Sequence, residues 1–432
     1  MRFISPSFNQ QGWTKSFDLN SIAHGTSPAF TKFSEHPTGE EYADYLQHVA
    51  SANHLNIQAQ TEVTSVRPLR GGRGFQVSLR STADTRGPAV EQRIRSRYVI
   101  WAAGEFQYPR APAGTLFPGS ELCRHNSSIR TWAEVSGNDF VVIGGYESGM
   151  DAACNLSALG KRCAVVSSTA CWNTATDDPS SELAPHTAQR VREACTSANP
   201  PRLLAPYRVY KVEAQKGGGF AVRARRSEKA DGPAEDARGQ KMGQHRVPIE
   251  VGAAMPPSAL TSDTIDLVLH TPRPPLLCVG FGGSVRLGVI KDLFEWGGSP
   301  ADGAVGDHSA EKQPRKRART ADSAKNEDDI EADAGSTEVE TRHSACGDGS
   351  PILSEMDEST KTPGLYLVGP SVRHKTLSFC FVYKFRQRFG IVADAIARGL
   401  GYPTTDAVSA CREMGMFLDD FSCCKGACGE KC

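Results

Sequence analysis

FVVIGGYESGMDAA, residues 140–153, is the stretch that decides the fold of this 432-residue chain. It joins an apolar run typical of a buried β-strand to a glycine-rich turn, and then to small residues with which a helix begins. This order is the first strand-turn-helix step of a dinucleotide-binding fold, in which the amides of a helix N-terminus meet a pyrophosphate. A strand-turn-helix that binds no nucleotide is the alternative interpretation.

The glycines of this turn stand where a Cβ atom would obstruct the backbone. We expect Gly144 to tighten the turn, Gly145 to keep the loop narrow and Gly149 to let the helix pack closely on the strand. Tyr146 stands where the fingerprint has its second glycine, so its ring must turn outward if a phosphate is to approach the backbone. The residues predicted to contact the cofactor here are Gly144, Gly145, Glu147, Ser148 and Gly149.

The next strand-like run, RCAVV, ends at Val166 and has no carboxylate after it. An acid at that point of the fold binds the ribose 2′-hydroxyl of NAD, whereas Ser167 and Ser168 leave room for a 2′-phosphate. Lys161 stands just before the run and Arg162 is its first residue. We therefore predict NADPH rather than NADH as the nucleotide, with Ser167 and Ser168 among its contacts. That these residues only cap the strand is the alternative.

Upstream, RYVIWAAGEFQYPRAP at 97–112 reads as a buried strand that ends in the turn Ala102-Ala103-Gly104. Together with the fingerprint that follows it, this segment resembles the flavin monooxygenase and pyridine-nucleotide-disulfide reductase superfamily. In that superfamily a similar turn links a flavin domain to an inserted nicotinamide domain. Further segments resemble the superfamily in the same order: HPTGEEYADYLQHVA (36–50), TEVTSV (61–66), PPLLCVGF (274–281) and GLYLVGPSVRH (364–374). The resemblance covers most of residues 1–400.

The resemblance implies an α/β chain with the fold of a flavoprotein that has two Rossmann-like dinucleotide-binding domains, with FAD and NADPH as cofactors. The implied organisation is a partial FAD-binding domain (1–135), an NAD(P)-binding domain (138–275), a return to the FAD-binding domain (276–299), a disordered insertion (300–350), the C-terminal part of the FAD-binding domain (351–402) and a cysteine-rich tail (403–432). The residues that it places at the cofactor on the flavin side are Ala102, Ala103, Gly104, Gly369, Arg373 and His374.

Two features depart from the superfamily pattern. The flavin domain of the family opens with its own G-x-G-x-x-G, and no such motif precedes residue 100 here, so the N-terminal strand-turn-helix is missing. We interpret this as truncation, with loss of the flavin pyrophosphate loop in a variant as the alternative, and in both cases expect weak or no flavin binding. Pro370 follows Gly369 where many relatives carry an aspartate that hydrogen-bonds the flavin. Flavin contact there would rest on backbone groups and on Arg373 or His374.

Composition indicates a globular enzyme of more than one domain. Lysine plus arginine and aspartate plus glutamate both number 49, so charge gives no argument for a nucleic-acid partner. No apolar run reaches the ~18–20 residues of a membrane span, and the N-terminus lacks the pattern of a signal peptide. The 13 cysteines are scattered rather than arranged as a compact disulfide framework. We therefore predict a cytoplasmic location.

Residues 300–350 are polar and almost without aromatic side chains, which predicts the disordered insertion. Its basic cluster KQPRKRAR, 312–319, is either a solvated loop or a nuclear localisation signal. At the C-terminus, Cys423, Cys424, Cys428 and Cys432 are candidate metal ligands, with redox-active thiols and a passive end as the alternatives.

The segment 379–401 has apolar residues near helical spacing and is predicted to form a helix. Its cations, Lys384, Arg386 and Arg388, either face a flavin phosphate or are solvated on an amphipathic helix. The segment 206–226 alternates polar and apolar residues around three glycines, which predicts a β-hairpin.

Two functional classes follow. The preferred one is a monooxygenase-like oxidoreductase that passes hydride from NADPH through FAD to oxygen or another acceptor. No C-x-x-C motif of a disulfide reductase occurs, and the F-x-G-x-x-x-H motif of many flavin monooxygenases is present in a stretched form with Phe117, Gly119 and His125. The alternative is a regulatory protein on the same fold that senses nucleotide or uses its cysteines for metal or thiol chemistry. Neither catalytic residues, substrate nor oligomeric state follow from the sequence.

Overall fold

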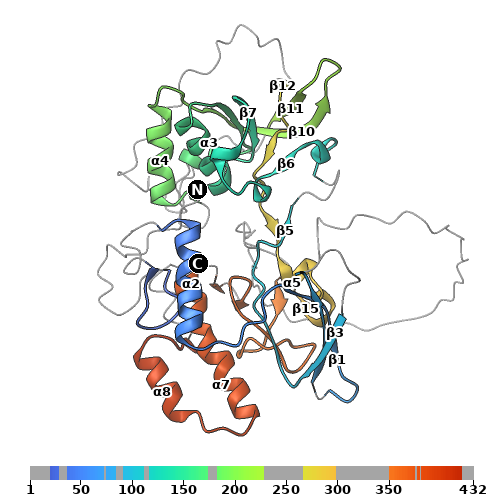
Figure 1. The fold of residues 1–432 in the computed structure, drawn as a ribbon, viewed down its shortest axis with the longest axis vertical. Helices are drawn as coiled ribbons and strands as arrows, with labels where there is room; N and C mark the ends of the chain where they lie inside the picture. The colour runs from blue at the N-terminus through green and yellow to red at the C-terminus, as the bar shows by residue number, and fades with distance from the viewer. Residues whose placement is uncertain are drawn as a thin grey trace, which may run out of the picture.

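A computed structural model describes residues 20–28, 37–72, 74–83, 91–110, 116–173, 182–227, 266–297, 350–374, 377–379 and 381–420. The predicted insertion, apart from its last residue, and the four cysteines of the tail lie outside these ranges. The described chain forms two units, which we call the upper and the lower unit after their places in Figure 1. The domain boundaries expected from the sequence stay predictions.

The upper unit is built on a parallel sheet of five strands in the order β6-β13-β7-β8-β9. Its strands are β6 (Arg124–His125), β13 (Leu276–Leu277), β7 (Asp139–Ile143), β8 (Arg162–Val166) and β9 (Arg202–Leu204). The helices α3 (Glu147–Ala158) and α4 (Pro185–Cys195) pack on one face, against Phe140 and Val142 of β7. The expected strand and helix around the glycine turn are therefore present, within an α/β fold.

The opposite face of this sheet is covered by three antiparallel strands, β10 (Tyr207–Ala214), β11 (Phe220–Arg226) and β12 (Asp266–Thr271). Val141 and Ile143 of β7 lie in the core between the two sheets. Alternate residues of β7 thus enter different cores, and a strand covered on both faces is apolar throughout, as in FVVI. The pairing of β10 with β11 confirms the predicted hairpin.

The lower unit combines an antiparallel sheet with a short parallel pair. Its sheet consists of β1 (Thr61–Pro68), β2 (Phe75–Ser81) and β3 (Glu91–Ser96), and the parallel pair of β4 (Val99–Trp101) and β17 (Leu365–Leu367). These strands share one hydrophobic core, to which Phe75, Phe294 and Phe379 contribute buried rings. The core therefore joins segments from both ends of the described chain.

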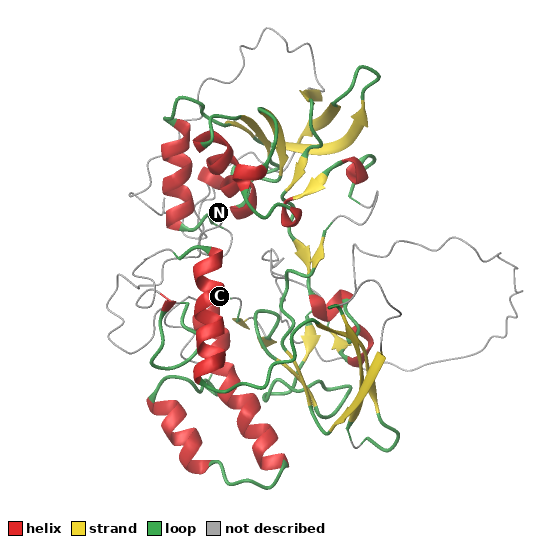
Figure 2. Cartoon of the chain, viewed as in Figure 1, coloured by secondary structure: helices red, strands yellow, loops and turns green. Residues whose placement is uncertain are grey.

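The remaining elements are short strands and helices, shown in Figure 2. The helices are α2 (Gly39–Ala52), α5 (Ser284–Leu287), α6 (Val382–Phe385), α7 (Phe389–Gly399) and α8 (Thr405–Glu413), and the strands are β15 (Glu295–Trp296), β16 (Pro351–Ile352), β18 (Arg373–His374) and β19 (Leu377–Ser378). The 3₁₀ turns are η1 (Ser120–Leu122), η2 (Asn126–Ser128), η3 (Trp132–Glu134), η4 (Cys171–Asn173), η7 (Lys291–Leu293) and η8 (Arg386–Arg388). Within the described part of the chain, no helix has the length and apolar character needed to cross a bilayer.

Helix α2 begins at a capping box, which has the sequence pattern T-x-x-E from Thr38 to Glu41. The backbone N–H of Thr38 donates to Oε2 of Glu41 at 2.7 Å, and the N–H of Glu41 donates to Oγ1 of Thr38 at 3.2 Å. Two amides that a helix start leaves without partners are satisfied in this way. The helix buries Tyr45 and Val49, so both its start and its inner face follow from local sequence.

The chain passes between the two units twice, and the two passages lie side by side. β5 (Tyr108–Pro109) leads from the lower unit to the upper, β14 (Phe281–Gly282) leads back, and the two strands pair antiparallel. The segments identified by resemblance at 97–112 and 274–281 each include part of one of these passages. The junction between the units is therefore made from segments far apart in the sequence.

Candidate functional site

The glycine turn lies at the carboxyl edge of the parallel sheet, between the ends of two neighbouring strands. The N–H of Gly144 donates to the carbonyl of Val166 at the end of β8, and the N–H of Cys278 after β13 donates to the carbonyl of Ile143. β7 continues through α3 into β8 on one side, while β13 enters from a distant segment on the other. This is the switch point at which open α/β sheets bind ligands.

Gly144 and Gly149 allow close backbone contacts in this turn. Gly144 has a φ of +104°, and a Cβ atom there would lie 2.4 Å from the carbonyl oxygen of Cys278. At Gly149, a Cβ atom would lie 1.9 Å from the carbonyl oxygen of Gly144. Helix α3 therefore passes close to the carbonyl at the end of β7, and it packs on the face of that strand.

Gly145 contacts the end of the next strand. A Cβ atom on Gly145 would lie 2.6 Å from Cβ of Ser167 and 3.1 Å from Cζ3 of Trp172. The buried Ser167 donates its N–H to the carbonyl of Leu204 at 2.9 Å, and its carbonyl accepts from the N–H of Tyr207 at 2.7 Å. Ser167 thus anchors the end of β8 under the turn, with the half-buried Ser168 beside it.

Tyr146 and Glu147 both reach toward helix α4 from the start of α3. Tyr146 is 38% exposed, and its hydroxyl donates to the carbonyl of Glu182. The carboxylate of Glu147 accepts from the N–H of Ala184 at 2.5 Å and from the hydroxyl of Thr187 at 2.7 Å. A carboxylate at a helix N-terminus is favourable there, so this side chain joins α3 to α4.

The two cations at the start of β8, Lys161 and Arg162, lie at the other edge of the sheet. Nζ of Lys161 donates to the carbonyls of Val135 and Gly137 at 2.7 and 2.8 Å. Arg162 forms two hydrogen bonds with Asp139, which hold the pKa of that carboxyl below its ordinary value. Neither cation is therefore placed to contact a nucleotide at the carboxyl edge.

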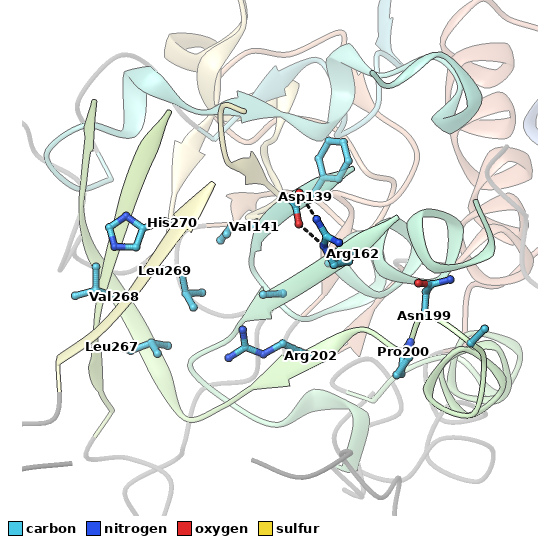
Figure 3. Close-up of a pocket in the computed structure, with 14 residues that line it drawn as sticks. Asp139, Val141, Arg162, Asn199, Pro200, Arg202, Leu267, Val268, Leu269 and His270 are labelled. Atoms are coloured by element: carbon cyan, nitrogen blue, oxygen red, sulfur yellow. Dashed lines mark hydrogen bonds and ion pairs between the residues drawn. The ribbon is translucent and has the colours of Figure 1, made fainter. Parts of the chain in front are cut away.

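A cavity of about 620 Å³ also opens at this amino edge. Figure 3 shows Asp139, Arg162 and Arg202 at the starts of β7, β8 and β9, facing residues 267–270 of β12. Dinucleotides bind beyond the carboxyl ends of the strands in this class of sheet. The cavity is therefore separate from the site that the glycine turn forms.

A second set of glycine turns lies in and beside the lower unit. β4 and β17 are parallel, so the turns that follow them meet at one edge, and the N–H of Val368 donates to the carbonyl of Trp101. Gly104, Gly280 and Gly369 have φ values of +75°, +84° and +103°, and a Cβ atom at each would meet nothing within 4 Å. These turns present backbone to open space, which is how a backbone can approach a cofactor closely.

The residues placed on the flavin side by resemblance differ in their surroundings. Ala102 is exposed, whereas Ala103, Arg373 and His374 are half-buried. Nε2 of His374 donates to Oδ1 of Asp357 at 2.5 Å, because a carboxylate oxygen can only accept. That nitrogen of His374 is therefore committed to a buried partner.

Asp357 is the centre of a buried ionic group with Arg388. Both side chains are inaccessible to solvent, and Nε and Nη2 of Arg388 donate to the two oxygens of Asp357 at 3.0 and 2.8 Å. Further hydrogen bonds run from Arg388 to the carbonyls of Leu418 and Glu355 at 2.5 and 2.6 Å. Asp357 has a φ of +61°, in the left-handed region.

This group bears on the two interpretations of the cations in the segment 379–401. The segment is helical from Val382 to Gly399, with α6, the 3₁₀ turn η8 and α7 following one another without a gap. The interpretation that its cations are solvated is wrong, because Lys384, Arg386 and Arg388 are 7%, 2% and 0% exposed. Contact with a flavin phosphate stays a prediction, with Arg388 already paired to Asp357.

The residues of the stretched monooxygenase motif lie near the junction of the units. Phe117 packs against the core between the two sheets of the upper unit, and Gly119 lies so close to Val212 that a Cβ atom would clash with its carbonyl. Nε2 of His125 lies 3.0 Å from the carbonyl oxygen of Gly280, and its ring stands edge-on to Phe281. The motif residues are thus used for packing and for holding the turn after β13.

Two residues of this region were missed by sequence reasoning. Asp357 has no local signal, since its partners Arg388 and His374 are distant in sequence. Glu105 directly follows Gly104, and its carboxylate accepts a hydrogen bond from the hydroxyl of Ser371. Its place next to a turn already assigned to a cofactor was the available signal.

Within the described ranges no cluster of His, Cys, Asp or Glu is arranged to hold a metal ion. The proposed ligands Cys423, Cys424, Cys428 and Cys432 lie outside those ranges.

Cys123 and Cys154 are free thiols, and burial is the main cause that raises the pKa of each to about 12.

We expect Cys123 and Cys154 to resist alkylation in the folded protein. With a thiol pKa near 12, only about one molecule in ten thousand carries the reactive thiolate at pH 8, against roughly a quarter for an ordinary thiol. Iodoacetamide labelling followed by peptide mass spectrometry measures this, with the protein in urea as control. Rates that agree within about tenfold between the two states would contradict it.

Comparison with known proteins agrees with this architecture. The staphylococcal bacillithiol disulfide reductase (Staphylococcus aureus) is 11% identical with a TM-score of 0.52, and the match covers 91% of this chain and 86% of that one. The ornithine N-hydroxylase of Kutzneria sp. 744, solved with reduced FAD, NADP⁺ and L-ornithine, is 14% identical with a TM-score of 0.50, over 85% and 79% of the two chains. At these identities the likeness shows the fold.

The family itself is shown by sequence. The family model described as pyridine nucleotide-disulphide oxidoreductase matches residues 1–230, more than half of the 432 residues. The matched range includes both the turn at Gly104 and the glycine turn at Gly144 to Gly149. The chain therefore belongs to the pyridine nucleotide-disulphide oxidoreductase family.

Proposed function

We propose that the protein is a monooxygenase-like oxidoreductase that passes hydride from NADPH through FAD to oxygen or another acceptor. The observation that carries this proposal is the pair of glycine turn sets, one at the carboxyl edge of the parallel sheet and one at the ends of β4 and β17. Two dinucleotides can be bound by such a pair. The family supports it, as do the reduced FAD and NADP⁺ bound by the similar Kutzneria hydroxylase.

NADPH is assigned to the upper unit. Gly144, Gly145 and Gly149 shape the turn, and the first amides of α3, at Glu147 and Ser148, would face the pyrophosphate when the nucleotide is bound. Ser167 and Ser168 follow β8, and no carboxylate occurs in residues 167–173 to repel a 2′-phosphate. The expected discrimination against NADH rests on this lack of an acid.

FAD is assigned to the turns at Ala102, Ala103, Gly104 and Gly369, with Arg373 and His374 beside them. These turns fit the cofactor because their glycines leave open space where a Cβ atom would stand. When bound, the flavin would accept hydride from NADPH and pass electrons on. The 432-residue sequence contains no C-x-x-C motif, which favours a monooxygenase-like reaction over reduction of a disulfide by a cysteine pair. We also propose the domain ranges and the cytoplasmic location that were expected from the sequence.

Titration of the purified full chain tests the proposal. We expect binding of FAD, measured by quenching of flavin fluorescence, and binding of NADPH tighter than that of NADH at equal ionic strength. Under nitrogen, NADPH should reduce the bound flavin. The measurement is the loss of flavin absorbance at about 450 nm. Since the sequence lacks a flavin G-x-G-x-x-G, FAD should be held weakly and titration should need an excess.

The outcome that contradicts the proposal is a chain that binds NADPH but no flavin at any concentration. Such a result would favour the second function, a nucleotide-sensing or metal-binding and thiol-dependent regulatory protein. The four cysteines of the C-terminal tail, with nothing in a flavin reaction to explain them, are the observation that favours this second candidate. Near-stoichiometric zinc or iron in the purified protein would then identify its ligand.

A further inference from the structure

Three turns meet at the edge where β4 and β17 end. Because the two strands are parallel neighbours, Glu105 after β4 and Ser371 after β17 come together, and the hydroxyl of Ser371 donates to Oε1 of Glu105. The third turn, residues 278–284, contains β14, and a Cβ atom on Gly283 would lie 3.4 Å from the carboxyl group of Glu105. The carboxylate of Glu105 therefore lies among all three turns.

Contacts between the same turns fix the backbone around this carboxylate. Nε1 of Trp101 donates to the hydroxyl of Ser284 at 3.0 Å, and Ser284 is fully buried. The N–H of Ser284 also lies 3.4 Å from the carbonyl oxygen of Gly104. Glu105 itself is half-buried, so it stands on a fixed base while one side remains accessible.

Charge makes this position selective for one kind of ligand group. The three turns are residues 102–107, 278–284 and 368–372. Glu105 is the one acidic residue within these ranges. A carboxylate accepts about four hydrogen bonds, and Ser371 accounts for one. An anion repels phosphate but accepts from hydroxyl groups. The groups it suits on a dinucleotide cofactor are therefore the hydroxyls of a sugar or a polyol.

We propose that Glu105 is a cofactor-positioning residue that accepts hydrogen bonds from the ribityl hydroxyls of the flavin. The inference rests on the proposed function, and it deepens that function by naming the group that orients the cofactor. The ribityl chain is preferred to the nicotinamide ribose because Glu105 follows β4 of the lower unit, beside the open turns at Gly104 and Gly369. Pro370, next to Ser371 in the same turn, has no side-chain acceptor to share this role.

The test measures binding of FAD and of NADPH separately, by fluorescence titration of the full chain. Glu105→Gln keeps the size of the side chain and removes its charge, and we expect the Kd for FAD to rise about 10- to 100-fold, as for loss of a hydrogen bond to a charged acceptor. The Kd for NADPH should not change. Glu121→Gln, which removes an exposed carboxylate of the upper unit, is the matched control and should change neither value.

The double variant Glu105→Gln/Pro370→Asp tests the role of the charge itself. It places a new carboxylate at position 370, in the turn that follows β17. The affinity for FAD should then return to within a few-fold of that of the unaltered protein. Unchanged FAD binding in Glu105→Gln would overturn the proposal, as would weaker NADPH binding in place of weaker FAD binding. A fall in melting temperature without recovery in the double variant would also overturn it, since Glu105 would then only hold the turns together. If the unaltered chain binds no FAD, the proposed function itself fails.

Discussion

Replacing Gly149 by valine is expected to abolish NADPH binding, with a loss of affinity beyond about 100-fold. The Cβ atom of any replacement would lie 1.9 Å from the carbonyl oxygen of Gly144, which is backbone and cannot turn aside as a side chain can. Helix α3 would have to move off the glycine turn, which carries its amides away from the pyrophosphate. Such overpacking also costs about 3 kcal/mol or more of stability. Fluorescence titration with NADPH measures the binding, and thermal unfolding measures the stability.

Two variants serve as controls for this result. Gly217→Val lies in the hairpin turn between β10 and β11, where a Cβ atom meets nothing within 4 Å, and it should leave NADPH binding unchanged. Tyr146→Gly brings the turn closer to the fingerprint and should preserve or strengthen binding, although it removes the hydrogen bond to Glu182. NADPH binding by a folded Gly149→Val protein at unaltered affinity would show that the nucleotide does not depend on this turn.

Replacing Asp357 by asparagine is expected to destabilise the lower unit by about 3–5 kcal/mol, the cost of breaking a buried ion pair from one side. Arg388 is 0% exposed and would be left as a buried cation without its anion. Asparagine retains the size of the side chain and tolerates the φ of +61°, so the effect isolates the charge. The midpoint of urea unfolding at unchanged slope measures it.

An exposed ion pair and a double variant distinguish this effect from a general loss of a salt bridge. The pair of Arg80 with Glu62 has side chains that are 49% and 48% exposed, so Glu62→Gln should cost only about 0–1 kcal/mol. In Asp357→Asn/Arg388→Met the stranded cation is gone, and a large part of the stability should return. Equal losses for Asp357→Asn and Glu62→Gln would show that burial adds nothing to the pair.

Local features of this protein follow from neighbouring residues and were predictable. FVVI is apolar throughout because β7 is covered on both faces, and the glycines after it are required by contacts that a Cβ atom would prevent. The T-x-x-E start of α2 and the hairpin of β10 and β11 depend on hydrogen bonds and turns within a few residues. Such signals are readable because the chain supplies both partners at short spacing.

The interpretation that the cations of 379–401 are solvated failed for the opposite reason. Its apolar spacing is helical, yet Arg386 and Arg388 are buried because their partners, the carbonyl of Ser21 and the carboxylate of Asp357, come from distant parts of the chain. An isolated amphipathic pattern assigns charged residues to water by default. Nothing near Arg388 in the sequence marks Asp357 as its partner.

By itself, the sequence determined the strand-turn-helix at residues 140–153, the start of α2, the hairpin and the family to which the chain belongs. Only the tertiary structure decided that Glu105 meets Ser371, 266 positions away, and that Asp357 receives Arg388 and His374. The physical reason is the order of strands. β4 and β17 become neighbours through the shared core, and that pairing brings together side chains whose spacing along the chain carries no periodic signal.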